Sequence, residues 1–138
     1  MSDFILDNSV AMRWCFDSGA HDYADHILDQ LETRQGTAFV PMIWRYEVSA
    51  VLARAEIKGF LIARKVAEFL EDLAALPIMV DTESASRVLT DVHRLAIQYR
   101  LSSYDAAYLE LASRLTLPLA SLDEELLAAC KAAGIATA

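Results

Sequence analysis

The chain has 138 residues, which is enough for one domain and too few for two of ordinary size. Hydrophobic residues make up 55% of it, which argues against long disorder, and its longest apolar run, residues 73–80, is far shorter than the roughly 20 residues that span a bilayer. The formal net charge of −8 argues against a protein held on nucleic acid by bulk positive charge.

Short apolar strands alternate with amphipathic helices along the chain. In the first half the predicted elements are a strand at residues 4–6, a helical turn through Val10 and Trp14, a helix from Tyr23 to near Gly36, a strand at 38–40, a helix from Pro41 to Gly59 and a helix at 63–75. In the second half they are a strand at 77–80, helices at 83–99 and 103–115, a strand at 117–121, a helix at 124–133 and a short strand at 135–137. This order predicts one α/β domain over residues 1–138, with a short parallel sheet of four or five strands and about seven helices.

Nothing at the start of the sequence looks like a targeting signal. No basic segment and no cleavage signature precede the first strand, so we expect a cytoplasmic protein without a membrane anchor. Cys15 and Cys130 lack the spacing of metal ligands and are expected to be reduced thiols of the core. The three histidines are scattered, which argues against a zinc site of His and Cys.

Basic residues gather in one stretch of this acidic chain. Between Arg45 and Lys65, five basic residues are accompanied by two acids, which gives the stretch a charge of +3. Such a strip can contact phosphates, but a solvated helix face is the simpler interpretation. The basic strip comprises Arg45, Arg54, Lys58, Arg64 and Lys65.

Two acids lie just beyond predicted strands, at the edge where ligands bind in parallel α/β sheets. Asp7 directly follows the first strand, and Asp123 follows the fourth strand by two residues. Either acid can instead cap the helix that comes next, Asp7 together with Asn8 and Ser9, and Asp123 in a capping box that begins at Ser121.

Glu47 interrupts an apolar helix face. It stands four residues from both Ile43 and Val51, and a carboxylate on a core-facing stripe is costly unless it is paired or binds a metal. The alternatives are an ion pair with Arg45 or Arg54, or a place at the edge of the stripe, where the carboxylate reaches water.

Asp105 shows the same pattern between Leu101 and Leu109. Its alternative role is structural, because Ser102 can cap the helix with Asp105 three residues later.

Carboxylates that converge without a cation repel one another, and divalent ions relieve this repulsion. Hard oxygen ligands favour Mg²⁺ or Mn²⁺ over Zn²⁺. The chain has no GxxxxGK[ST] or GxGxxG motif and no motif of a nucleophilic serine or cysteine. The pattern therefore points to metal-dependent hydrolysis of phosphodiester bonds.

The chain resembles the PIN-domain family, and most closely the VapC-type toxins of bacterial toxin–antitoxin pairs. The resemblance covers essentially the whole chain and implies a PIN-like fold. Asn8 follows the first acid where the family often has Thr or Ser, and Ser9 comes next. The segments that carry the resemblance are residues 4–10, 46–52, 101–109 and 117–123, and the family's four acids fall on Asp7, Glu47, Asp105 and Asp123.

This resemblance implies an endoribonuclease that depends on Mg²⁺ or Mn²⁺ and is the toxin of a toxin–antitoxin pair. Asp7, Asp105 and Asp123 would hold the metal directly or through water. Glu47 would complete the site and orient or deprotonate the attacking water. The expected site is thus Asp7, Glu47, Asp105 and Asp123, supported by the hydroxyl residues Ser9 and Ser121.

The resemblance also implies three partners: an RNA substrate, a second copy in a homodimer, and a small antitoxin whose tail runs over the groove near the active site. Arg45, Arg54 and Lys58 then become candidate contacts to RNA or to the antitoxin.

Two other classes of protein stay open. The same fold can serve as a non-catalytic module whose acidic pocket binds only a metal or a protein. A phosphoacceptor receiver domain also clusters acids at strand ends, but it needs a lysine after a late strand, and the only lysine beyond residue 65 is Lys131, inside the last predicted helix.

Several aromatic residues can stack bases, although packing is the simpler interpretation. They are Trp14, Trp44, Tyr46, Tyr104 and Tyr108.

Overall fold

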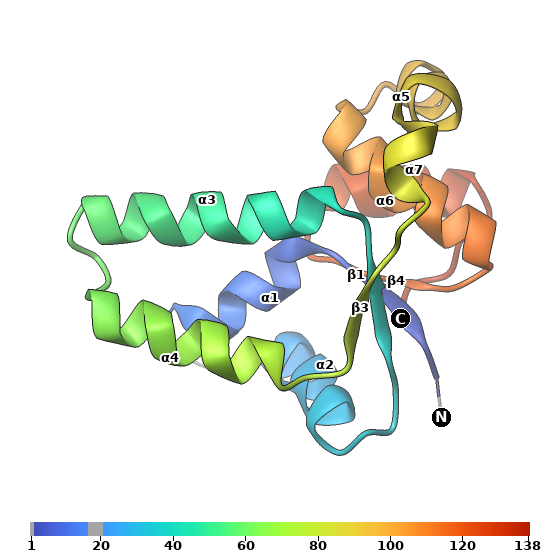
Figure 1. Ribbon diagram of the computed structural model, residues 1–138. Helices are drawn as coiled ribbons and strands as arrows, with labels where there is room; N and C mark the ends of the chain where they lie inside the picture. The colour runs from blue at the N-terminus through green and yellow to red at the C-terminus, as the bar shows by residue number, and fades with distance from the viewer. Residues whose placement is uncertain (1, 17–20) are drawn as a thin grey trace.

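A parallel sheet forms the centre of the molecule. The computed structural model describes residues 2–16 and 21–138, and within these the sheet has four strands in the order β3-β2-β1-β4 (Figure 1). The strands are β1 (Phe4–Leu6), β2 (Ala38–Val40), β3 (Ile78–Val80) and β4 (Leu119–Ala120). The predicted strand at 135–137 is reduced to one parallel bridge between Leu119 and Thr137.

β1 lies in the middle of the sheet. Phe4 pairs with Ala38 of β2, and Ile5 pairs with Leu119 of β4. All three residues of β1 are buried, as expected for an apolar strand of a parallel sheet covered on both faces. The carboxyl end of β1, where Asp7 follows, therefore lies beside the carboxyl end of β4.

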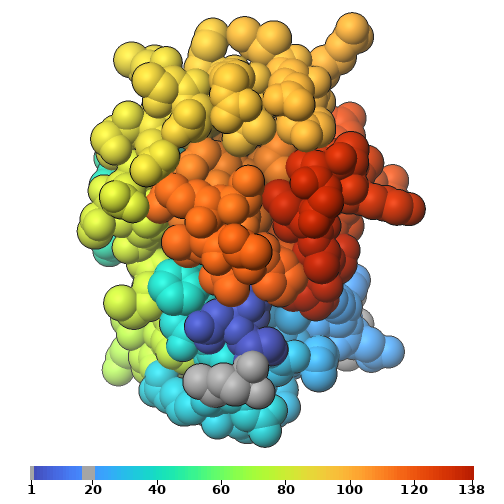
Figure 2. All heavy atoms as spheres, turned by 90° about the vertical axis from the view of Figure 1, so that its right-hand side faces the viewer, coloured from blue at the N-terminus to red at the C-terminus, as the bar shows by residue number. Residues whose placement is uncertain are grey.

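Seven α-helices in the described part of the chain surround the sheet. They are α1 (Asn8–Cys15), α2 (Asp22–Glu32), α3 (Ile43–Ile57), α4 (Ala63–Ala74), α5 (His93–Tyr99), α6 (Ser103–Leu115) and α7 (Glu124–Ala132). In Figure 1, α1 to α4 lie on one side of the strands, and α5 to α7 gather on the other. Figure 2 shows the face built by α5, α6 and α7, with the start of the chain emerging below them.

The predicted helix over residues 83–99 is wrong in its first half. Ser and Thr side chains compete there with helical hydrogen bonding. The hydroxyl of Ser84 donates to the carboxylate of Asp81 at 2.6 Å, and that of Ser86 donates to the carbonyl of Glu83 at 2.9 Å. Three elements replace the single helix, namely a 3₁₀ turn η1 (Ser84–Arg87), a π-helical segment η2 (Val88–Val92) and α5.

A cluster of ion pairs ties α6 to the carboxyl end of β3. The guanidinium of Arg114, only 14% exposed, lies 2.6 Å from Asp81, 2.8 Å from Glu110 and 3.1 Å from Glu83. Burial opposes the charge of Asp81, but the hydrogen bonds from Arg114 and Ser84 outweigh it and lower the pKa of this carboxyl. The cluster fixes the position of α6, which carries Asp105 near its other end.

The buried apolar residues form a single core. Cys15 and Cys130 are free thiols, and Cys130 is fully packed in the core while Cys15 is half-buried. Among the described residues, none of the helices combines the length and the apolar composition that crossing a membrane requires.

Candidate active site

The structure brings the four predicted acids together from four elements. Asp7 follows β1, Glu47 lies on α3, Asp105 lies in the first turn of α6, and Asp123 stands at the start of α7. The charge of Asp123 repels Asp7. Asp7 and Asp105 both repel Glu47. Asp105 in turn is repelled by Asp123 and Asp7. The four carboxylates thus form one electrostatic cluster near the carboxyl ends of β1 and β4, which we call the acidic site.

Asp7 is the most deeply buried member, with 6% of its surface exposed. Its Oδ2 accepts hydrogen bonds from the hydroxyls of Ser9 and Ser121, both at 2.7 Å. Asp7 occupies the N-cap position of α1, but its side chain makes no capping hydrogen bond, so the capping alternative does not hold for this residue. Burial raises the pKa of Asp7, the two hydroxyls oppose this rise, and repulsion from Asp123 adds to it.

The two serines are held so that they donate to Asp7. The Oγ of Ser9 accepts from the amide of Leu122 at 2.9 Å, and the Oγ of Ser121 accepts from the amide of Asp123 at 3.0 Å. Because each hydroxyl oxygen already accepts an amide proton, its own proton is free to point at the carboxylate. Ser9 of α1 and Ser121 after β4 therefore hold the same oxygen of Asp7, with their own hydroxyl oxygens 3.4 Å apart.

Asp123 combines two roles that the sequence presented as alternatives. Its Oδ1 accepts from the amides of Glu125 at 3.0 Å and Leu126 at 3.1 Å, and so caps α7. The capping residue is Asp123 and not Ser121, whose hydroxyl is engaged with Asp7. The cap orients the Asp123 carboxylate while its charge acts on Asp7 and Asp105.

Glu47 lies half-buried at the edge of the apolar stripe of α3, and no ion pair with Arg45 or Arg54 forms within the described residues. Burial raises the pKa of Glu47, and repulsion from Asp7 and Asp105 adds to this rise. The stripe itself is displaced by one residue from the predicted face and consists of Trp44, Val48, Leu52 and Ala55.

Tyr108 is the site residue whose role the sequence did not reveal. It is fully buried, as the packing interpretation expected, but its hydroxyl also donates to Oε1 of Glu47 at 2.5 Å. Burial and the charges of Glu47 and Asp7 raise the pKa of Tyr108 far above its usual value, so the phenol acts only as a hydrogen-bond partner. Its spacing of three residues from Asp105 on one helix face is a signal that could have identified it.

Asp105 has the most perturbed carboxyl of the cluster. Burial, followed by repulsion from Asp123 and Asp7, raises the pKa of Asp105 to about 6. Ser102 caps α6 by accepting the amide of Asp105 at 3.1 Å, so the predicted cap is present as well. Without a cation, the charge of Asp105 is the least stable in the acidic site.

The donor set fits a hard divalent cation. In Asp7, Glu47 and Asp123 the side-chain hydrogen bonds described above converge on one oxygen and leave the second oxygen unused. Carboxylate oxygens are the ligands that Mg²⁺ and Mn²⁺ prefer. As they stand in residues 2–16 and 21–138, no three His, Cys, Asp or Glu side chains are close enough to enclose an ion.

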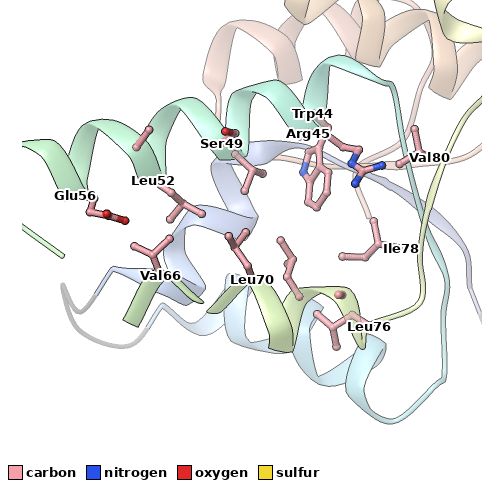
Figure 3. A pocket seen from close by; sticks show the side chains of 14 residues that line it. Trp44, Arg45, Ser49, Leu52, Glu56, Val66, Leu70, Leu76, Ile78 and Val80 are labelled. Atoms are coloured by element: carbon pink, nitrogen blue, oxygen red, sulfur yellow. The ribbon is translucent and has the colours of Figure 1, made fainter. Parts of the chain in front are cut away.

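The basic strip lies on the surface at one side of the molecule. All five of its residues are exposed, and Arg64 makes only a long contact of 4.0 Å with Glu68. Arg45 also borders an apolar groove of about 570 Å³ between α3 and α4, where Figure 3 shows Trp44, Leu52, Val66 and Leu70 among the side chains that line it.

The predicted aromatic candidates divide into two groups. Trp44 and Tyr108 are buried, and the indole of Trp14 donates to the carbonyl of Ala24, so these three pack inside the fold. Tyr46 and Tyr104 are 69% and 61% exposed and remain candidates for stacking on bases.

The profile of the PIN-domain family matches residues 4–132, and the chain therefore belongs to this family. Domains of this family are typically nucleases, and these nucleases generally use divalent metals. The predicted resemblance and the PIN-like α/β fold are both confirmed, which rules out a receiver domain.

Two solved structures share this fold. PAE2754 from Pyrobaculum aerophilum is 21% identical with a TM-score of 0.68, and the match covers 93% of this chain and 79% of that chain. FitAcB from Neisseria gonorrhoeae is 18% identical with a TM-score of 0.63, and the match covers 97% of this chain and 95% of that chain. A comparison with curated protein sequences finds no match.

Proposed function

We propose that the chain is an endoribonuclease that depends on Mg²⁺ or Mn²⁺, and that it is the VapC-type toxin of a toxin–antitoxin pair in the cytoplasm. The observation that carries this proposal is the acidic site, in which Asp7, Glu47, Asp105 and Asp123 repel one another at the carboxyl ends of parallel strands. Structural acids are normally paired with cations, whereas Asp7, Glu47 and Asp123 accept their hydrogen bonds from neutral donors.

In this proposal Asp7, Asp105 and Asp123 hold the cation, directly or through water. The bound metal would supply a water of lowered pKa and would stabilise the charge that develops on the phosphate. Glu47 orients the attacking water and accepts its proton at Oε2, since Oε1 is occupied by Tyr108. Its raised pKa brings the Glu47 carboxyl closer to the value that suits a general base near neutral pH.

The surface of the molecule offers contacts for the proposed partners. Arg45, Arg54 and Lys58 are exposed cations that can bind RNA phosphates or an antitoxin, and Tyr46 and Tyr104 are exposed rings on which bases can stack. The apolar groove between α3 and α4 can bind a segment of the antitoxin.

A second copy of the chain would cover further apolar surface. Leu89 of η2 and Ile97 of α5 are 88% and 67% exposed, which is unusual for large aliphatic side chains on neighbouring elements. We include the homodimer in the proposal on this observation.

The experiment uses partner-free protein, a pool of structured RNAs, and buffers that contain Mg²⁺, Mn²⁺ or EDTA. We expect discrete cuts that require metal, and a loss of at least about a hundredfold in Asp7→Asn, because removing a ligand charge disables the metal site. Asp25→Asn is the matched control, since it removes the charge of an exposed aspartate on α2.

Full activity of folded Asp7→Asn would overturn the proposal. Metal binding without any cleavage, seen as a raised melting temperature in the partner-free protein, would instead support the non-catalytic module of the same fold.

A further inference from the structure

The contact between Tyr108 and Glu47 joins two helices that are far apart in sequence. Tyr108 of α6 is 0% exposed, and its hydroxyl lies 2.5 Å from Oε1 of a residue 61 positions earlier, on α3. A phenol buried in this way has no access to bulk water, so the hydrogen bond to Glu47 satisfies its donor.

We propose that Tyr108 is a positioning residue of the nuclease reaction, which acts by holding Oε1 of Glu47 so that Oε2 is presented to the attacking water. This inference rests on the proposed function and adds a residue to it. Tyr108 itself touches neither the cation nor the RNA in this proposal.

Glu47 needs such a partner because little else holds it in place. It lies at the edge of the buried stripe of α3, it has no cationic partner among the described residues, and Asp7 and Asp105 repel it. A free glutamate side chain also gains rotamer entropy when it leaves the site. Without the hydroxyl, the carboxylate would swing away from the other acids towards solvent.

The position of Tyr108 on α6 links this role to the cation. Asp105, a proposed metal ligand, stands three residues before Tyr108 on the same helix, so the two side chains project from neighbouring turns. One rigid helix therefore sets both the place of a ligand and the place of the group that holds the general base.

Tyr108→Phe removes only the hydroxyl, and the chain offers a matched control. The hydroxyl of Tyr23 donates to the carbonyl of Ala138 at 2.9 Å, away from the acidic site, so Tyr23→Phe deletes a comparable hydrogen bond. We expect kcat to fall at least about tenfold in Tyr108→Phe, with KM for RNA unchanged, because a hydrogen bond to a charged group is worth about 1.5–3 kcal/mol. Tyr23→Phe should leave both constants at their wild-type values.

A double variant tests whether the effect passes through Glu47. If it does, Tyr108→Phe combined with Glu47→Gln will be no slower than Glu47→Gln alone. Losses that multiply, or a wild-type kcat in Tyr108→Phe while Glu47→Gln is impaired, would overturn the role of Tyr108 and leave the proposed function intact. Absence of cleavage by the wild-type protein would refute both.

A second measurement reads the contact without activity or metal. A buried hydroxyl proton that is held by a carboxylate exchanges slowly and should give a downfield resonance in the proton NMR spectrum of the metal-free protein. We expect this resonance to disappear in Tyr108→Phe, to move upfield in Glu47→Gln and to persist in Tyr23→Phe. A spectrum of Glu47→Gln identical to that of the wild-type protein would overturn the proposed contact, even if Tyr108→Phe proved too unstable for kinetics.

Discussion

Replacing Asp105 by asparagine tests how strongly the acids repel one another. The pKa of Asp105 is raised from 3.8 to about 6, first by burial and then by the charges of Asp123 and Asp7. The folded protein therefore disfavours the charged carboxylate, and we expect Asp105→Asn to stabilise the metal-free protein near neutral pH.

The expected gain in stability is the penalty on the charged carboxylate less the favourable interaction that the substitution removes. A rise in pKa from 3.8 to about 6 corresponds to a penalty of at most ~3 kcal/mol for the charged form. Asp105 is only half-buried, and solvent screening reduces this penalty by roughly half. The substitution also loses ~0.5 kcal/mol of favourable interaction with the N-terminus of α6. The net gain is ~1 kcal/mol, or an increase in Tm of about 4 °C for a domain of this size.

The pH dependence fixes the sign of the effect. Because the pKa of Asp105 is raised in the folded state, the folded protein binds the proton more tightly, and stability falls as the pH rises from 3.8 to about 6. The advantage of Asp105→Asn should be complete above about pH 6 and should vanish below about pH 4.

The assay is thermal unfolding followed by circular dichroism in EDTA, at about pH 7.5 and about pH 4. Asp25→Asn is the control, since it removes an exposed charge from the first turn of α2 and should change stability by less than about 0.5 kcal/mol. A loss of stability in Asp105→Asn at the higher pH would refute the repulsion. With Mg²⁺ in place of EDTA, the wild-type protein should melt at a higher temperature than Asp105→Asn, because only the wild type keeps the full set of ligands.

Three further substitutions test other parts of the structure. Arg114→Ala should lower the free energy of unfolding in urea by about 3 kcal/mol, because it leaves buried carboxylates without their cation. The control Arg64→Ala removes an exposed ion pair worth about 0.3 kcal/mol, and equal losses in the two variants would contradict the buried cluster. Ser121→Ala should raise the pKa of Asp7 further and weaken Mn²⁺ binding near pH 6 several-fold by calorimetry, and unchanged affinity would show that one hydroxyl is enough. Gly36→Ala should lower stability by about 1–3 kcal/mol, because the added Cβ would lie 2.3 Å from a backbone carbonyl oxygen, and an unchanged melting temperature would show that the chain moves freely there.

Much of the fold is readable in the sequence because its elements are local patterns. The apolar runs at 4–6 and 38–40 coincide with β1 and β2, and Gly59, with a φ of +80°, stops α3 close to the predicted end. The segment 83–99 misled the prediction, because its apolar periodicity does not reveal hydroxyl side chains that bond the backbone. The strand predicted at 117–121 is only two residues long, because Pro118 accepts a hydrogen bond from the amide of Ile5 but has no amide proton with which to extend the ladder.

The acidic site was predictable as a set of residues but not as a set of contacts. Order and spacing singled out the acids, while the partner of each one depends on tertiary structure. Ser121 reaches Asp7 across 114 positions, and Tyr108 reaches Glu47 across 61. No local pattern encodes such pairs, whereas a cap at the start of α7 was predictable because it is local, although the capping residue is Asp123 and not Ser121.

The central place of β1 has a consequence for how the protein is made. β1 is synthesised before the other three described strands and pairs with β4, which is synthesised after them, and Asp7 receives the hydroxyl of Ser121 only when that pairing exists. Contacts between such distant residues form late, because closing the long loop between them costs conformational entropy before the contacts stabilise the fold. A nascent chain that does not yet contain β4 thus carries Asp7, Glu47 and even Asp105 without the arrangement that unites them, and any activity that depends on the acidic site would begin only after β4, Ser121 and Asp123 have been synthesised.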